Sequence, residues 1–476
     1  MSEELEWQTR RDRINKKLEA LKPPWKIIKY KDGLDTSSLD RHAVEEYPTA
    51  NGPADYALFV RGKLLGIIEA KKVSVGPQNV LEQAKRYSRG AFSGPGNWDG
   101  YRVPFLYATN GEIIWHIDVR NPRNISRQIS NFHTADALSD FFAYDFSSGL
   151  EKLIQNPAPV EGLWPYQLQA VESVEAAIAR GKRAMLLAMA TGTGKTFTTV
   201  SLIYRLLESG AARRVLFLVD RRALAAQAVR EFASFTTPSG TKFNKEYEVY
   251  SQSFRKEDFG DDKSFDPKVL PNDYLTAPQA THTFVYVSTI QRMTINLLGW
   301  EHAFAQNPND PDFEGETQQL DIPIHAFDII IADECHRGYT AKETATWRRV
   351  MDHFDAVKVG LTATPASHTL ALFREVIYRY TTEQAVLDGV LVDYEAVKIK
   401  SDVRINGIFL KPGEHVGLWI RKQGRKTMMN WKTSGSLPSM ILNRRSPPLR
   451  VIERSFMKWP DMPISIRKTQ AVFPRF

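Results

Sequence analysis

The sequence predicts an α/β protein in which a mixed α/β domain precedes a doubly wound domain built on a parallel sheet. At 476 residues the chain can bury two or three cores of ordinary size. Short strand-like runs and helical patterns mix in residues 1–155. From residue 156 to 400, continuous apolar runs alternate with helical patterns, which is typical of strands covered by helices on both faces.

Composition excludes several classes of protein. Residues 1–20 are charged throughout, and no apolar run reaches the roughly 18 residues needed to cross a bilayer, so we expect neither a signal peptide nor a membrane span. The only cysteine, Cys335, excludes an intramolecular disulfide and a cysteine-based zinc cluster, and it fits a reducing cytoplasm. The formal net charge is +8, but residues 418–476 hold 13 Lys and Arg against two acidic residues, which leaves −3 for the rest. Net charge is therefore weak evidence that the main body binds DNA.

The first domain, residues 1–155, begins with a polar helical pattern from Glu3 to Leu21. The segments that follow are strand-like runs at 55–60, 63–70, 104–110 and 112–119, and a helical pattern from Asn79 to Arg89. A linker-like stretch with two prolines at 156–164 marks the expected end of the domain.

Two of these strands form a predicted β-hairpin around Gly62. Folding the chain about this glycine places Asp55 opposite Glu69, within about one residue of register. Lys71 joins Glu69 on the same face because strand side chains repeat every two residues. The hairpin is thus expected to gather Asp55, Glu69 and Lys71.

This cluster has the composition of a metal site. Two adjacent carboxylates repel each other unless a cation neutralises them, and oxygen ligands of this kind suit Mg²⁺. Such a metal can lower the pKa of a bound water and stabilise charge on a phosphate, while a lysine orients the nucleophile. The pattern favours phosphodiester cleavage, and the alternative is an ion-pair cluster on the surface.

Pro53-Ala54-Asp55 followed by Glu69-Ala70-Lys71 resembles the PD-(D/E)xK nucleases. On the next helix, Gln83 and Tyr87 lie four residues apart and look like the Gln-x-x-x-Tyr element of one branch of that family. The resemblance implies catalytic roles for all five residues, with Asp55 and Glu69 as metal ligands. In the same branch an acidic residue on the first helix completes the site, and Glu6 is the candidate, with Glu45 as rival.

The second domain contains five expected parallel strands, at residues 184–189, 215–220, 283–289, 328–333 and 358–364. The polar stretch from Phe235 to Thr281 is expected to be an elaborated loop.

A glycine-rich loop, "MATGTGKT" at residues 189–196, connects the first of these strands to a helical pattern. Gly192 and Gly194 let backbone amides approach phosphate oxygens, Lys195 reaches the β and γ phosphates, and Thr196 can bind Mg²⁺. The loop also contains Thr191 and Thr193, which are expected to contact ATP, and Met189 stands where such loops usually begin with glycine.

The partner carboxylates are expected in "DECH", which follows the run at 328–333. Asp333 would hold Mg²⁺ through water, and Glu334 would orient or deprotonate the attacking water. Cys335 is interpreted as a permissive position in this motif.

Together these segments resemble the first RecA-like domain of superfamily 2 helicase-like ATPases. In that family a glutamine upstream reads adenine, which implies this role for Gln167, and Trp164 either packs on the base or belongs to the core. Segments 218–228 and 287–293 resemble the motifs that contact the DNA backbone. "GLTATP" at 360–365 resembles the segment that couples hydrolysis to domain movement, with Thr362 and Thr364 expected to face the cleft.

The order of these motifs, followed by "YRYTTEQAVLDGVLVDYE" at 378–395, resembles the restriction subunit of type I restriction-modification enzymes. The resemblance implies ATP and Mg²⁺ as cofactors, ATP-dependent translocation and cleavage of double-stranded DNA, and assembly with modification (methyltransferase) and specificity subunits. Two alternatives are another nuclease-helicase of defence or repair and an inactive fragment that binds ATP and DNA.

The segment 401–476 does not fit the family's second motor domain, which contributes arginines to the ATP site. About 80 residues follow Glu395, too few for that domain. We therefore expect a chain that binds ATP and DNA weakly but does not translocate. Residues 418–476 lack an amphipathic period, so we interpret them as read out of frame or as replacing the true continuation, with a basic DNA-binding arm as the rival.

Overall fold

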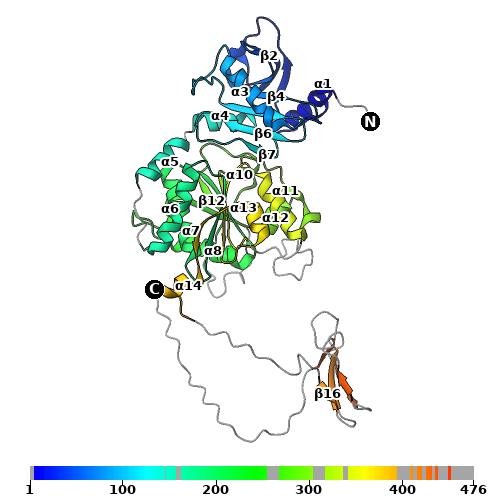
Figure 1. Ribbon diagram of the computed structural model, residues 1–476, viewed down its shortest axis with the longest axis vertical. Coiled ribbons are helices and arrows are strands. Elements are labelled where there is room, and N and C mark those ends of the chain that lie inside the picture. The colour runs from blue at the N-terminus through cyan, green and yellow to red at the C-terminus, as the bar shows by residue number, and fades with distance from the viewer. Residues whose placement is uncertain are drawn as a thin grey trace. The chain divides into compact units, whose positions relative to one another are not determined.

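The computed structural model describes residues 5–144, 146–156, 162–252, 254, 267–303, 317–335 and 341–393, together with five short strands between residues 408 and 451. The chain divides into two compact units, Met1–Val392 and Asp393–Phe476. Within the described residues, no helix combines the length and the apolar character that crossing a membrane requires. The first unit contains two separate sheets, and the expected boundary between them at residue 155 stays a prediction (Figure 1).

The first sheet has seven strands in chain order, which are β1 (Lys26–Lys29), β2 (His42–Thr49), β3 (Gly52–Val60), β4 (Lys63–Ala70), β5 (Phe105–Thr109), β6 (Ile114–Asp118) and β7 (Arg127–Ile129). The pairs β1–β2 and β4–β5 are parallel, and the other pairs are antiparallel. Helix α3 (Leu81–Gly90) connects β4 to β5, as a parallel pair requires.

A hydrophobic cluster covers each face of this sheet. On one face, alternate residues of β3 pack with α2 (Asn15–Glu19) and α4 (Ala135–Ala143). On the other face, the intervening residues pack with α3. The first helical segment combines α1 (Glu6–Thr9), a π-helical turn (Arg10–Ile14) and α2, which confirms the expected N-terminal helix with a distortion inside it.

The hairpin register agrees with the expectation. Tyr56 pairs with Ile68 and Leu58 with Gly66, so the next positions along the ladder are Asp55 and Glu69. A register shift follows between Leu58 and Phe59, next to the turn. Strands β1, β2 and β7 were not expected, because they are short or interrupted by charged residues.

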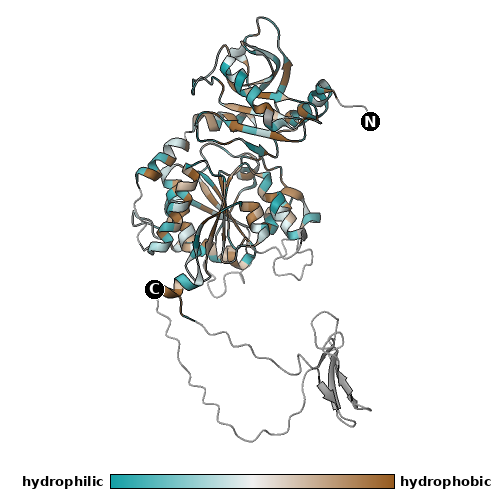
Figure 2. Cartoon of the chain, in the orientation of Figure 1, coloured by the Kyte–Doolittle hydropathy of each residue, from teal (hydrophilic) through white to brown (hydrophobic). Residues whose placement is uncertain are grey.

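The second sheet is parallel throughout, in the order β11-β10-β12-β9-β13-β14-β8-β15. Its strands are β8 (Ala184–Met189), β9 (Arg214–Val219), β10 (Glu248–Ser251), β11 (Lys268–Val269), β12 (Phe284–Thr289), β13 (Ile329–Ala332), β14 (Val357–Thr362) and β15 (Val376–Tyr380). All five expected strands are present, and Figure 2 shows hydrophobic residues concentrated in this sheet.

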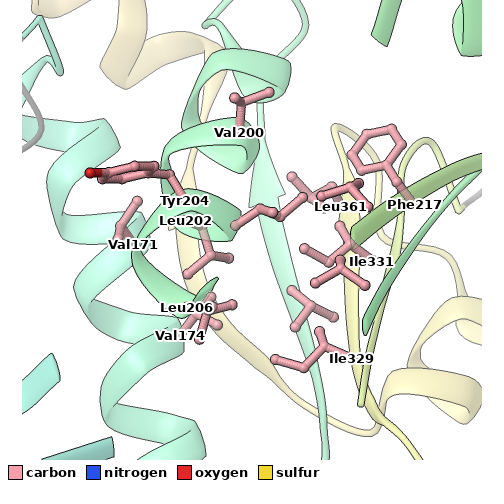
Figure 3. Close-up of a cluster of buried hydrophobic side chains, with 14 of the residues drawn as sticks. Val171, Val174, Val200, Leu202, Tyr204, Leu206, Phe217, Ile329, Ile331 and Leu361 are labelled. Atoms are coloured by element: carbon pink, nitrogen blue, oxygen red, sulfur yellow. The ribbon is translucent and has the colours of Figure 1, made fainter. Parts of the chain in front are cut away.

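Helices cover both faces of the sheet, so the doubly wound architecture is confirmed. One face packs against α6 (Pro165–Ala179), α7 (Lys195–Ser209) and α8 (Arg222–Ser234). The other packs against α11 (Ile290–Leu298), α12 (Ala341–His353) and α13 (Ser367–Phe373). Figure 3 shows part of the first core, where valines of α6 and leucines of α7 face Ile331 of β13 and Leu361 of β14.

The expectation of a loop from Phe235 to Thr281 is wrong in part. This stretch contributes α9 (Phe243–Glu246), β10, β11 and α10 (Asn272–Thr276), and its two strands extend the sheet beyond β12. Both strands are short; β11 forms the edge of the sheet, where polar residues are common, and β10 lies next to it, so neither has the apolar run that marks a buried strand. The described part of the unit also contains the α-helices α5 (Phe146–Gln155) and α14 (Thr382–Leu387).

A buried polar network joins β7 and the segment that follows it to Asp355, which precedes β14 of the second sheet. The Asp355 carboxylate accepts hydrogen bonds from Arg127 and, at 3.0 Å, from Arg183, and it lies 3.1 Å from His133 Nε2. His116, His133 and Asp355 are close enough to one another to hold a metal ion, but the guanidinium groups of the two arginines already neutralise the Asp355 carboxylate. The network therefore connects the two sheets within the first unit.

In the second unit the structure describes β16 (Ile408–Leu410), β17 (His415–Ile420), β18 (Arg425–Asn430), β19 (Gly435–Leu437) and β20 (Leu449–Val451). β16 pairs with β19, and β17 pairs with β18 and β20, all antiparallel. The rest of the expected basic tail lies outside the described residues. The interpretation of its origin stays a prediction.

Candidate functional site

The hairpin brings together Asp55 of β3, Glu69 of β4 and Lys71, which follows β4. We call these three residues and Glu6 of α1 the carboxylate cluster. Lys71 Nζ lies 2.7 Å from Glu69 Oε1 and 3.9 Å from Glu6 Oε2. The backbone N–H of Ala70 donates to Asp55 Oδ2 at 2.7 Å. Asp55, Glu69, Lys71 and Glu6 thus meet at one end of the hairpin.

The cluster holds its carboxylates in a buried setting. The Glu69 side chain is 3% exposed, and its Oε2 has no hydrogen-bond partner within the part of the chain that the structure describes. Burial, and then the nearby Asp55, raise the pKa of Glu69 to about 8. Burial also raises the pKa of Asp55, against the opposing effects of the Ala70 N–H and of Arg10. A divalent cation fits this arrangement, because it would bind the unpartnered oxygen and neutralise both carboxylates.

The geometry favours Glu6 over Glu45 as the third acidic residue. Glu6 contacts Lys71, whereas Glu45 on β2 accepts a hydrogen bond from Asn15 Nδ2 at 3.3 Å. On α3, Gln83 Nε2 donates to the Tyr87 hydroxyl at 2.8 Å. Among residues 5–144 this pair makes no hydrogen bond to the carboxylates, so its catalytic role stays a prediction.

Arg10, the first residue of the π-helical turn, also belongs to this site and was not expected from the sequence. Its Nη1 lies 3.0 Å from Asp55 Oδ1 and also contacts Glu46 on β2. The sequence offers one signal for Arg10. It lies four residues after Glu6, a spacing that puts both side chains on the same face of a helix.

The phosphate loop, residues 189–196, connects β8 to α7 as expected. Gly192 and Gly194 adopt φ angles of 85° and 73°, a region that favours glycine. A Cβ at Gly194 would lie 2.5 Å from Gln167 Nε2. The Thr193 carbonyl accepts hydrogen bonds from the Tyr166 hydroxyl at 2.9 Å and from Gln167 Nε2 at 3.1 Å. Tyr166 and Gln167, both on α6, therefore hold the phosphate loop in position.

Lys195 and Glu334 meet although they are far apart in the sequence. Lys195 Nζ lies 3.3 Å from Glu334 Oε1, and both side chains are largely buried. Asp333 Oδ1 accepts a hydrogen bond from the Glu334 N–H at 2.9 Å. Both segments follow the carboxyl ends of strands, β8 and β13, where parallel α/β sheets bind ligands. In the same loop Thr191 is exposed, and Thr196 is half-buried at the start of α7.

Other expected residues around this loop divide between structural and exposed positions. Gln167 is buried and also accepts a hydrogen bond from the Trp164 N–H at 3.0 Å, so it supports the loop whether or not it contacts adenine. Trp164 is 56% exposed, which excludes a core position.

After β14, Thr362 and Thr364 do not both face a cleft as expected. Thr362 is fully buried and accepts a hydrogen bond from the Thr364 N–H at 3.1 Å, while Thr364 is exposed. Cys335 is also buried and its thiol donates to the Leu361 carbonyl at 3.3 Å. Burial raises the pKa of this thiol far above its ordinary value, which supports a structural position.

A stack of two tyrosine rings beside the phosphate loop was not expected from the sequence. The rings of Tyr166 and Tyr380 lie 4.1 Å apart and nearly parallel, and the Tyr380 hydroxyl donates to Asp388 Oδ2 at 2.9 Å. This stack connects the loop with β15 and α14.

Comparisons with known proteins match both sheets. Residues 25–142 match the family model "Type I restriction enzyme EcoKI endonuclease subunit second domain", and residues 162–367 match "Type III restriction enzyme, res subunit". The EcoKI endonuclease subunit of Escherichia coli (strain K12), a type I restriction enzyme, is 31% identical over 452 residues, which cover 82% of this chain and 35% of the relative. The EcoAI endonuclease subunit of Escherichia coli is 28% identical over 379 residues, which cover 74% and 38%.

Among solved structures, a fragment described as an HsdR subunit of a type I restriction enzyme from Vibrio vulnificus YJ016 is 20% identical. The match covers 82% of this chain and 62% of that chain, with a TM-score of 0.30. The chain spans about a third of the length of the two Escherichia coli relatives.

Proposed function

Because the chain belongs to the family of type I restriction enzyme endonuclease subunits, we propose that it joins a metal-dependent DNA nuclease site to an ATPase site. The carboxylate cluster is the nuclease site, in a fold of the PD-(D/E)xK class. The phosphate loop, with Asp333 and Glu334, is the ATPase site of a RecA-like helicase domain. The observation that carries the proposal is Glu69, a buried carboxylate with an unpartnered oxygen beside a second carboxylate and a lysine.

In the nuclease site, Asp55 and Glu69 would hold Mg²⁺, and Glu6 is placed to complete the acidic set. When bound, the cation would supply positive charge for the phosphate and for the attacking water. Lys71 has its ammonium group 2.7 Å from Glu69 Oε1, so it is positioned to donate a hydrogen bond to the nucleophile or to the scissile phosphate. Gln83 and Tyr87 are proposed to act from α3.

In the ATPase site, the amides of Gly192, Gly194 and their neighbours would bind the phosphates of ATP, and Lys195 would contact the β and γ phosphates. The 3.3 Å contact between Lys195 Nζ and Glu334 Oε1 supports a role for this carboxylate beside the terminal phosphate and its attacking water. Glu334 would orient the water, while Thr196 and Asp333 would hold Mg²⁺. Thr191, Thr193 and Gln167 would complete the nucleotide contacts.

For the whole protein, family membership supports ATP-driven translocation of double-stranded DNA and cleavage of unmodified DNA. It also supports assembly with modification (methyltransferase) and specificity subunits. This chain spans about a third of the length of the EcoKI endonuclease subunit that it matches.

The first test is ATP hydrolysis by the purified chain, with and without duplex DNA, beside Lys195→Ala. Turnover that DNA stimulates and that the variant loses supports the ATPase proposal. ATP binding without turnover in the wild type favours the alternative of an ATP- and DNA-binding fragment. No ATP binding would contradict the assignment of the phosphate loop.

The nuclease proposal is tested with circular duplex DNA and Mg²⁺, with Glu69→Ala beside Glu82→Ala. Glu82 lies on α3 and pairs at the surface with Lys85, so its loss should leave cleavage unchanged. Cleavage lost only in Glu69→Ala supports the site. Equal cleavage by both variants would refute it.

A further inference from the structure

Arg10 lies between two carboxylates at the edge of the carboxylate cluster. Its Nη1 is 3.0 Å from Asp55 Oδ1, and the same atom contacts Glu46 Oε1. Arg10 also begins the π-helical turn Arg10–Ile14. Such turns are rare and occur frequently at functional sites, so the helix is distorted at the point where its side chain enters the cluster.

Glu46 has an unusual backbone for a residue inside a strand. Its φ is 55°, a left-handed value that side chains other than glycine seldom adopt, which marks local strain. In the ladder Glu45 pairs with Tyr56 and Tyr47 with Ala54, so Glu46 and Asp55 face each other without a regular pair. Opposed carboxylates repel, and the guanidinium of Arg10 neutralises both.

Arg10 is not needed to orient Asp55, because the Ala70 N–H already holds Oδ2 at 2.7 Å. The guanidinium instead contacts Oδ1, the Asp55 oxygen that the Ala70 N–H leaves available to a cation. A divalent cation on Asp55 would therefore share this oxygen with a positive group about 3 Å from it, and the two cations repel. Glu46 offers the guanidinium a second carboxylate, and its side chain is half exposed.

We propose that Arg10 is an internal counter-ion that weakens cation binding by the carboxylate cluster, and that Glu46 holds the guanidinium when Asp55 binds the cation. Arg10 and Glu46 thus set the divalent-ion concentration at which the cluster is occupied. Neither residue contacts the substrate in this scheme, so both are positioning residues. The inference rests on the proposed nuclease site.

The test measures Ca²⁺ and Mn²⁺ binding to the full chain by isothermal titration calorimetry. Arg10→Met should bind each ion about tenfold more tightly than the wild type, since a repelling charge is removed. Glu46→Gln should bind more weakly by a few fold, because the guanidinium then has only Asp55. Arg11→Met is the matched control, since Arg11 pairs with Asp12 at the surface and its loss changes the net charge equally.

The double variant separates an indirect role of Glu46 from a direct one. If Glu46 acts through Arg10, Arg10→Met/Glu46→Gln binds ions like Arg10→Met. If Glu46 were itself a ligand or a direct source of negative charge, Glu46→Gln would weaken binding equally in both backgrounds, which would overturn its assigned role. Arg10→Lys, which keeps the charge but cannot bridge two carboxylates, should give an intermediate affinity and serves if Arg10→Met fails to fold.

The outcomes distinguish this inference from the nuclease proposal. Ion binding that Asp55→Asn abolishes, but that Arg10→Met and Arg10→Lys leave unchanged or weaken, overturns the role of Arg10 alone. A wild-type chain, an Arg10→Met variant and an Asp55→Asn variant that all bind no divalent ion overturn both. Tighter binding by Arg10→Met than by Arg11→Met supports both.

Discussion

Replacing Glu69 by glutamine is expected to stabilise the metal-free fold while abolishing DNA cleavage. The side chain is 3% exposed, and burial and Asp55 raise its pKa from 4.5 to about 8. The unfolded chain therefore releases this proton at a lower pH than the folded chain, so ionisation opposes folding as the pH rises. Glutamine keeps the shape of the protonated group and cannot ionise.

The size and pH window of the effect follow from the two pKa values. The penalty is absent below about pH 4, under 1 kcal/mol at pH 5, about 3 kcal/mol at pH 7 and nearly constant above pH 8. Glu69→Gln should thus gain stability over the wild type progressively between pH 5 and pH 8. Added Mg²⁺ should narrow the difference, because it binds and stabilises the folded wild type alone.

The assay is guanidinium unfolding from pH 5 to pH 9 in a chelator, repeated with Mg²⁺, together with cleavage of duplex DNA. Glu82→Gln, whose carboxylate is exposed beside Lys85, should stay within about 0.5 kcal/mol of the wild type. The reasoning is refuted if Glu69→Gln is less stable than the wild type throughout, or if the difference does not grow with pH.

Three further expectations concern the phosphate loop and the polar network. Gly194→Ala should lower the affinity for ATP by about tenfold or more, because its Cβ would lie 2.5 Å from Gln167 Nε2. Gly240 has an equally left-handed backbone but open space around it, so Gly240→Ala should cost only about 1 kcal/mol of stability and leave ATP binding intact. Titration of both variants with a fluorescent nucleotide checks this prediction. Tyr166→Phe should weaken ATP binding by a few fold with little loss of stability, since it removes one hydrogen bond of about 1 kcal/mol to the Thr193 carbonyl, and unchanged affinity would show that Gln167 alone suffices. Asp355→Asn should destabilise the first unit by about 3–5 kcal/mol in guanidinium unfolding, because it leaves Arg127 and Arg183 without their buried counter-ion. Burial alone would raise the pKa of Asp355, but the two arginines hold it well below its ordinary value, so this contribution should persist from pH 8 down to pH 5 and be lost only as the pH falls through that depressed pKa.

Local patterns in the sequence determined the secondary structure near both sites. Gly62 predicted the hairpin and its register because a short turn fixes which residues face each other, and this placed Asp55 beside Glu69. The five apolar runs predicted the parallel strands because strands buried on both faces need apolar residues at successive positions. The glycines of the phosphate loop predicted a close approach of the backbone to phosphate, and Gly192 and Gly194 adopt left-handed φ angles that favour glycine.

Only the tertiary structure decided which distant segments contact one another, and these contacts set the burial and the pKa values of the site residues. Strand β10 pairs with β12, and the edge strand β11 pairs with β10, so their own polar sequences did not reveal them. The pairing of Lys195 with Glu334, the buried position of Thr362 and the network at Asp355 join segments that no local period relates. The sequence by itself supplied the carboxylates, the lysines and the glycines, because spacing along strands and turns is local. The burial that raises the pKa of Glu69, and the approach of Arg10 to Asp55, depend on packing between distant elements, which only the folded chain determines.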